Sequence, residues 1–296
     1  MAEACANCGQ SLHGEFCHAC GQRRFREADR RLGHLLRQAV ATATELDGRF
    51  WGSLRALAFR PGLLSRDYLD GRRRRWMAPM ALFLLANVLY FVLPTGVTDF
   101  NLPLENQVRQ PYHGALAERM VQARIARAEQ ERLARWATLP EDRRAVRPEP
   151  VQRAEVAAAY DARAGDVGKA LIIIHVPLLA LGLWLCFHRR RAYFAEHLVV
   201  ALHEFTFLLL FFQLVLLPAG WLYIALAGAT GGGMPPWAMA ISLVLVGGHF
   251  TLALRRAYDA PWWAAVLLPL PLLVAMMHAS VMTYRPAQFL VTWAIT

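Results

Sequence analysis

The sequence lacks the short motifs that mark the commonest enzyme sites. It has no glycine-rich phosphate loop leading into a lysine, no Gly-x-Ser-x-Gly elbow and no His-Glu-x-x-His pair. The glycine run at residues 231–233 has no lysine after it and is expected to form a flexible turn. No internal repeat is detectable. These absences predict no reaction, so the chain is expected not to be an enzyme.

Charged residues are also scarce. They make up 18% of the 296 residues, whereas 56% are hydrophobic and the mean hydropathy is +0.27. A soluble domain of this size would usually be less apolar. The hydrophobic residues gather in long runs in the second half, which predicts membrane spans in place of one large core. The lipid bilayer is therefore the first expected partner.

The formal net charge of +10 is unevenly distributed. Residues 1–76 contain 14 arginines and 8 acidic residues, whereas residues 94–166 contain 11 arginines and 11 acidic residues. The excess lies beside apolar runs, which is typical of the cytoplasmic flanks of membrane proteins. Membrane topology accounts for this charge better than nucleic-acid binding does, and no nucleic-acid partner is expected.

Cysteine is rare, with five in the chain, and four of these lie in the first 20 residues. They form two Cys-x2-Cys pairs, each followed by Gly-Gln, and this spacing predicts a metal site in a reducing compartment. Four thiolates complete the tetrahedral shell of zinc, so the metal would be structural. His13 and His18 are close enough to compete as ligands, and four free thiols are the alternative. We predict a zinc ribbon in residues 1–22, with the ligands Cys5, Cys8, Cys17 and Cys20.

Residues 23–76 are interpreted as amphipathic helices on the cytosolic surface of the membrane. Apolar residues recur at three- and four-residue spacing through residues 30–58, and a shorter apolar stretch follows Pro61-Gly62. A basic amphipathic segment next to a membrane lies on the bilayer surface or packs against the spanning helices. An ordinary soluble linker is the alternative.

Residues 77–296 are predicted to form an all-α, polytopic transmembrane bundle of about five spans. A span needs about 20 apolar residues, so the first and fourth candidates are short and the third is long. Pro177 and Pro218 are expected to break or kink their helices. The candidate spans cover residues 77–93, 167–187, 198–227, 237–254 and 262–283.

Three arginine clusters define the predicted orientation. Residues 72–75, 189–191 and 255–256 all fall on one side of a five-span chain, and that side is cytosolic by the positive-inside rule. The N-terminus is then cytosolic and the C-terminus extracytoplasmic, in a bacterial inner membrane. The loop at residues 94–166 is extracytoplasmic, with expected helices at residues 116–137 and 151–164.

Three groups of residues together resemble a known family. The first is the ribbon that ends in Cys20-Gly21-Gln22. The second runs from Pro61-Gly62 through Tyr68 and Gly71-Arg72-Arg73 to Pro79. The third is Tyr193, Glu196-His197 and Ala201-Leu202-His203. Their order and spacing, over about residues 4–210, resemble the bacterial membrane family named domain of unknown function 3667. The resemblance implies an architecture of a zinc ribbon and a membrane bundle, without an established activity.

Ionisable residues inside a span are costly and are candidates for function. Glu196, His197, His203 and Glu204 lie at the start of the third span. Seven residues make two helical turns, so Glu196 shares a face with His203, and His197 shares one with Glu204. The alternative is a polar cap that bonds neighbouring helices. His175, His249 and His278 lie at different predicted depths and are not expected to form one haem or metal site.

Three functional hypotheses follow. The preferred one is a non-enzymatic membrane protein whose zinc ribbon is a cytosolic docking or assembly module for a protein partner. The second is a small transporter or channel-like bundle that uses His203 and Glu204. The third, weaker one is a membrane enzyme acting on lipid near residues 196–204. The sequence does not indicate an oligomeric state.

Overall fold

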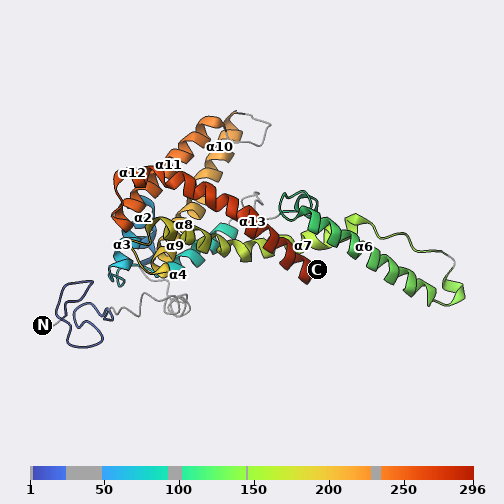
Figure 1. Cartoon of the computed structure of the whole chain (residues 1–296), viewed down its shortest axis with the longest axis horizontal. Helices are drawn as coiled ribbons and strands as arrows, with labels where there is room; N and C mark the ends of the chain where they lie inside the picture. Colours follow the sequence, from blue (N-terminus) through green and yellow to red (C-terminus); the bar gives the residue numbers. More distant parts are fainter. Residues whose placement is uncertain (1–2, 25–48, 93–101, 145, 228–234) are drawn as a thin grey trace. The chain divides into compact units, whose positions relative to one another are not determined.

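The structure is a computed structural model that describes residues 3–24, 49–92, 102–144, 146–227 and 235–296. The regular elements of these residues are helices (Figure 1). The N-terminal segment also has two isolated β-bridges. The predicted all-α class is confirmed for the described residues. Of the first predicted amphipathic helix, residues 30–58, the part at residues 30–48 lies outside them.

The chain divides into two compact units. Unit 1 comprises Met1–Thr95 and His175–Met276, and unit 2 comprises Gly96–Ile174 and Met277–Thr296. Both boundaries in the second half of the chain fall within long helices. Each unit therefore contains segments that are far apart in the sequence.

Unit 1 is built around α9 (Phe194–Phe211), most of whose residues are buried. Tyr193 and Glu196 form a capping box that starts this helix. Helix α9 packs against its neighbours on several sides, as the labels in Figure 1 show. These neighbours are α2 (Arg49–Phe59), α3 (Leu63–Leu69), α4 (Pro79–Val92), α8 (His175–Phe187) and α11 (Pro236–Tyr258). The helical part of unit 1 also includes the π-helical segment η4 (Phe212–Leu216), α10 (Leu217–Ala227), α12 (Trp262–Leu267) and the start of α13 (Pro269–Ile295).

Two ring pairs give the direction of α4 relative to α9. Phe83 lies beside Phe205 with ring centroids 6.2 Å apart, and Tyr90 lies beside Phe212 at 6.1 Å. Seven residues separate the members of each pair on both helices. The two helices therefore run parallel over two turns, and α4 accompanies α9 along the bundle.

Unit 2 contains α5 (Leu104–Gln107), α6 (Gly114–Ala137), the 3-10 turn η2 (Glu141–Arg143), α7 (Arg153–Leu171) and the end of α13 (Pro269–Ile295). Its core gathers Tyr160 of α7, Phe289 of α13 and Leu104 of α5, all completely buried. The described residues between 102 and 166 thus contain two main helices as expected, and these pack around the last turns of α13. The end of α13 contributes Phe289 and Trp293 to this core.

Four described helices are long and apolar enough to cross a membrane, which indicates a membrane protein. They are Arg153–Phe187, Phe194–Leu226, Trp237–Tyr258 and Trp262–Ile295, and Pro79–Phe91 is a shorter apolar helix. Helices of 33 to 35 residues exceed the roughly 20 residues that one crossing requires. The long helices therefore include turns that lie beyond the hydrocarbon layer.

Pro177 and Pro218 distort the helices of the second and third predicted spans, but both helices continue past the proline. The predicted gap between the loop helix and the second span is wrong, because α7 and α8 form one helix joined by the 3-10 turn η3 (Ile172–Ile174). This turn lies just before Pro177, which has no N–H for the regular helix bond. Likewise η4 lies just before Pro218, at the kink expected there.

The described part of the amphipathic segment packs against the spanning helices. Leu57 of α2 and Leu64 of α3 join a buried cluster with Leu82 of α4 and Leu210 of α9. Gly62, between α2 and α3, has φ +74, and a Cβ at this position would lie 2.7 Å from the backbone oxygen of Ala253. Glycine is therefore required for the close approach of this turn to α11.

Candidate functional site: the cysteine cluster and the buried polar cluster

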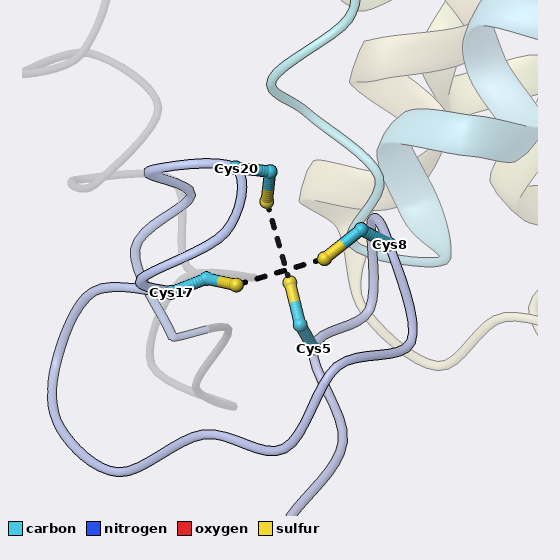
Figure 2. A group of neighbouring side chains, drawn as sticks. All are labelled: Cys5, Cys8, Cys17 and Cys20. Atoms are coloured by element: carbon cyan, nitrogen blue, oxygen red, sulfur yellow. Dashed lines mark hydrogen bonds between the residues drawn. The ribbon is translucent and has the colours of Figure 1, made fainter.

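The four N-terminal cysteines converge on one point, as Figure 2 shows. Each Cys-x2-Cys-Gly-Gln repeat folds as a tight turn. In the first, the amide of Gly9 donates to the carbonyl of Cys5 at 2.8 Å, and in the second the amide of Gly21 donates to that of Cys17 at 2.8 Å. Both glycines have positive φ, at 78° and 69°, which glycine adopts without strain. The repeats therefore present two thiols each to a common centre.

The geometry of the four sulfurs fits zinc. All lie within 4.8 Å of one another, with Cys5 and Cys20 at 3.7 Å and Cys8 and Cys17 at 3.6 Å. Zinc–sulfur bonds of about 2.3 Å in a tetrahedron place sulfurs roughly 3.8 Å apart. Four sulfurs leave no open coordination position. The residues present could therefore hold one metal ion in a structural role.

The pKa values of the thiols also favour a bound cation. A hydrogen bond from the backbone amide of Gln22 lowers the pKa of Cys20 to about 7. The amide of Gln10 lowers that of Cys8, but burial and the neighbouring sulfurs outweigh it and raise the pKa of Cys8 to about 12. The cluster by itself therefore resists full ionisation, because thiolates repel one another. A divalent cation would remove this repulsion.

The second repeat also touches the loop before α4. The side chain of Gln22 is buried; its amide nitrogen donates to the carbonyl of Gly71, and its oxygen accepts from the amides of Arg73 and Arg74, both at 3.1 Å. Gln10, at the same place in the first repeat, is exposed. In the sequence, Gln22 stands out only as part of the Cys20-Gly21-Gln22 motif. Two Gly-Gln pairs are present, and no local pattern indicates that Gln22, and not Gln10, binds the loop before α4.

An acidic centre organises the same loop. Asp67 accepts from Arg72 at 2.7 Å and from the indole of Trp76 at 2.7 Å. Asp70 pairs with Arg66 at 2.8 Å, with Arg72 at 3.0 Å and with Arg191 at 3.5 Å. Burial alone would raise the pKa of Asp70, but Arg66 and Arg72 outweigh it, and the pKa is lowered. This carboxylate thus remains charged and joins α3 to the turn between α8 and α9.

The three motifs that carry the family resemblance meet in unit 1. The first contacts the second through Gln22 and Gly71. The second contacts the third through Ser65 of α3, whose hydroxyl lies 2.9 Å from Nδ1 of His203. Nothing in the sequence pattern singled out Ser65, because a serine in a short helix has many ordinary roles.

Glu204 and His203 are both buried, 3% and 2% exposed. A carboxylate oxygen of Glu204 lies 3.2 Å from Nδ1 of His249 on α11, and Nε2 of His249 donates to the carbonyl of Leu57 at 2.8 Å. The ring of Phe207 stacks on His249 with centroids 3.5 Å apart. By contrast, Nε2 of His203 has no hydrogen-bond partner among the described residues. We name His203, Glu204, His249 and Ser65 the buried polar cluster.

The other half of the predicted site has structural contacts. Nδ1 of His197 lies 2.9 Å from the hydroxyl of Tyr258, and its Nε2 donates to the carbonyl of Arg191 at 3.1 Å. Glu196 caps α9 at the amide of Tyr193 and lies 3.7 Å from Arg191. His197 and Glu204 both face α11, as expected for residues two turns apart. Glu196 and His197 lie at the helix start and do not join the buried polar cluster.

The remaining two histidines of the predicted spans have aromatic neighbours. His175 stacks on Phe205 with centroids 5.5 Å apart, and His278, in unit 2, lies 3.2 Å from the hydroxyl of Tyr112. Of the three histidines in the other spans, only His249 is bonded to Glu204.

These features define a helical membrane protein with an N-terminal cysteine cluster that could hold a metal ion. A family model described as "Protein of unknown function (DUF3667)" matches residues 47–91, which supports the resemblance over that segment. The matched residues form α2, α3 and most of α4. Neither the curated proteins nor the solved structures yield a match to this chain.

Proposed function

We propose that this chain is a non-enzymatic membrane protein whose N-terminal ribbon, holding zinc, is an assembly module that docks on its own bundle. The observation that carries the proposal is the buried side chain of Gln22, with its three hydrogen bonds to the backbone of residues 71–74. Zinc folds the segment that presents Gln22, since a ribbon this small has little other core. Phe16, 63% exposed on the ribbon, offers an apolar contact for a cytosolic protein partner.

Matched substitutions test the docking. Gln22→Ala removes the hydrogen bonds to the loop, whereas Gln10→Ala changes the equivalent exposed residue. We expect Gln22→Ala to speed tryptic cleavage at residues 72–75 by roughly tenfold or more, because several hydrogen bonds of about 1 kcal/mol each are lost. Both variants should keep one zinc per chain. Equal cleavage rates in the two variants would show that the ribbon does not dock.

The metal is tested separately. Cys8→Ser combined with Cys20→Ser should abolish zinc binding, measured by metal analysis of the purified chain, and should expose residues 72–75 as Gln22→Ala does. Cys186→Ser, outside the cluster, is the control and should leave the zinc content unchanged. A zinc content that does not fall in the double variant contradicts the proposed ligand set.

The proposal includes five spans with the N-terminus cytosolic, in a bacterial inner membrane. Arg191 contacts Asp70, so the two ends of residues 70–191 lie on one side of the bundle. The helix Arg153–Phe187 crosses once between them, and a second crossing is needed to return. Helix α4, parallel to the spanning α9, supplies it. The arginine clusters then mark the cytosolic side.

Cysteine labelling tests this topology. In a Cys186→Ser background, Ala137→Cys in α6 should react with an impermeant maleimide added to intact cells, and Ala58→Cys in α2 should react only after lysis. Reporter fusions after Thr296 should give an extracytoplasmic signal. Protection of position 137 in intact cells would overturn the arrangement.

A second candidate function is ion or proton transfer through the bundle. The observation that favours it is the unpartnered Nε2 of the buried His203 next to the Glu204–His249 pair. Buried polar atoms within a span are usually paired or line a pathway. With the chain in liposomes containing a pH-sensitive dye, an imposed potential should drive acidification that Glu204→Gln abolishes. Glu118→Gln, in unit 2, is the control. Flux equal to that of protein-free liposomes would exclude this function.

A further inference from the structure

Helix α2 separates two hollows of opposite character. On one side is a pocket of about 680 Å³ whose lining includes four arginines and a tryptophan. On the other is a groove of about 790 Å³ lined mainly by apolar side chains of α2, α9 and α11. Arg55 and Phe59 line both. The four arginines of the pocket are Arg49, Arg55, Arg60 and Arg75.

The pocket is strongly basic. No acidic residue lines it among the residues the structure describes, and Trp76 forms part of its wall, with the guanidinium of Arg75 at 4.8 Å from that ring. Guanidinium groups bind phosphate oxygens through paired hydrogen bonds. Several guanidinium groups around one hollow thus favour a phosphate-bearing ligand over a neutral one.

The groove is suited to hydrocarbon. Its walls include Phe207 and Phe211 of α9, Val244 and Leu252 of α11, and Leu54 of α2. A volume of this size is in the usual range of ligand sites, about 300–1,000 Å³. The α9 and α11 walls belong to helices that can cross the membrane, so lipid chains have direct access to the groove.

The rim between the two hollows carries exposed aromatic residues. Trp51 is 71% exposed and Phe59 is 80% exposed. Aromatic side chains are enriched where headgroups meet hydrocarbon, and basic pockets beside spanning helices bind anionic headgroups. The charge on one side of α2 and the hydrocarbon surface on the other match the two ends of a single amphiphile.

We propose that α2 and the adjoining helices bind an anionic phospholipid, with its phosphate headgroup in the arginine pocket and an acyl chain in the apolar groove. Arg55 and Phe59 lie where the glycerol region of the lipid would cross α2. The site shares no residue with the cysteine cluster, and of the buried polar cluster it includes His249, which contributes one face to the groove.

Binding of a fluorescent phosphatidylglycerol to the full chain in neutral detergent tests the proposal. Phosphatidylglycerol should bind at least tenfold more tightly than phosphatidylcholine with the same chains. Arg55→Gln with Arg60→Gln should weaken phosphatidylglycerol binding about twentyfold, since each arginine near an anionic headgroup contributes roughly fivefold. The control is Arg127→Gln, an exposed arginine of unit 2, which should have no effect.

A second variant tests the groove without altering charge. Ala58 is exposed and lines the groove, so Ala58→Trp should fill it and weaken binding of both lipids by tenfold or more. Unchanged zinc content and gel-filtration behaviour would show that each variant is folded. Equal affinity for the two lipids, or no effect of the arginine changes, would overturn the proposal.

Other occupants give distinct results. Competition by soluble glycerophosphate at the affinity of the lipid would indicate a free-phosphate site. Lipid binding that appears only after deletion of residues 25–46 would assign the groove to the chain's own preceding segment. Binding that is lost as the protein associates would assign it to a second copy. Each of these results contradicts a lipid site.

Discussion

The two compact units place polar and apolar residues in opposite ways. In unit 1, large apolar side chains such as Val244, 72% exposed, and Trp263, 69% exposed, point outward, while Glu204 and His203 are buried. In unit 2, Tyr160 and Phe289 are buried, and the charged residues of α6 lie outside. The difference identifies the medium around each unit. Unit 1 is organised for lipid and unit 2 for water.

The close packing within the units differs as well. Unit 1 uses small residues, and Gly62 approaches the backbone at Ala253. Ring pairs occur in both units, but in unit 2 they form the centre of the core, where Phe289 lies between Tyr160 and Trp293 at centroid distances of 6.0 and 5.6 Å. In lipid there is little hydrophobic drive between helices, so short interhelical distances provide the contact energy. In water the burial of large apolar area provides it.

Truncation of the aromatic core should have the largest effect. Phe289→Ala removes a completely buried ring, and we expect unit 2 to lose about 3–5 kcal/mol of unfolding free energy. Hydrogen exchange of α6 and α7 would measure it. Ile295→Ala, at a residue 48% exposed, is the control and should cost far less. A loss below about 1 kcal/mol for Phe289→Ala would contradict the view that burial of large apolar side chains stabilises unit 2.

Adding one methyl group at Gly62 should cost unit 1 somewhat less unfolding free energy than Phe289→Ala costs unit 2. Gly62→Ala combines the left-handed backbone penalty of about 1–2 kcal/mol with overpacking of about 1–3 kcal/mol. Denaturant unfolding in mixed micelles would measure the sum. Gly9→Ala has a similar φ of 78° but nothing within 4 Å of the added Cβ, so it should show the backbone penalty alone. Equal costs at both positions would mean that the approach to α11 is unimportant.

The smallest effect concerns the surface of unit 2. Arg153 binds both carboxylate oxygens of Glu118, at 2.7 and 2.9 Å, and this hydrogen bonding lowers the pKa of Glu118 to about 2. A carboxyl with a lowered pKa stabilises the folded state above its unfolded pKa of about 4.5, and this stability is lost as the pH falls towards 2. Solvent screening limits it to at most about 1 kcal/mol.

Glu118→Gln should therefore reduce the stability of unit 2 slightly at pH 7 and leave it unchanged near pH 2. Thermal unfolding at the two pH values would show this. Glu131→Gln, whose carboxylate is 68% exposed beside Arg135, is a control expected to change little at either pH. A larger effect at pH 2 than at pH 7 would reverse the sign of the argument.

Much of the bundle could be predicted because hydropathy and arginine position act locally in the sequence. The cysteine cluster was equally accessible, since two short repeats contain all its ligands. The contacts that Gln22 and His203 make with distant parts of the chain could not be predicted. Ser65 meets His203, and Gln22 meets Gly71, through contacts that span 138 and 49 residues. No local pattern records such pairings.

The helix limits failed for a related reason. Hydropathy falls where α7 leaves the apolar run, so the sequence pattern placed a break near residue 166, yet the backbone bonds continue through a 3-10 turn. The sequence pattern also ended the fifth span at residue 283, whereas α13 continues to Ile295. Phe289 and Trp293 are apolar because they fill the core of unit 2.

The composition of unit 2 has a consequence for biosynthesis. Its core needs Leu104, made early, and Phe289, which is translated after α12. Helices α6 and α7 therefore lack their aromatic centre until α13 has been translated. Completion of this core marks a chain whose insertion has succeeded, and a chain that stops before residue 277 leaves the apolar face of α7 exposed to proteases.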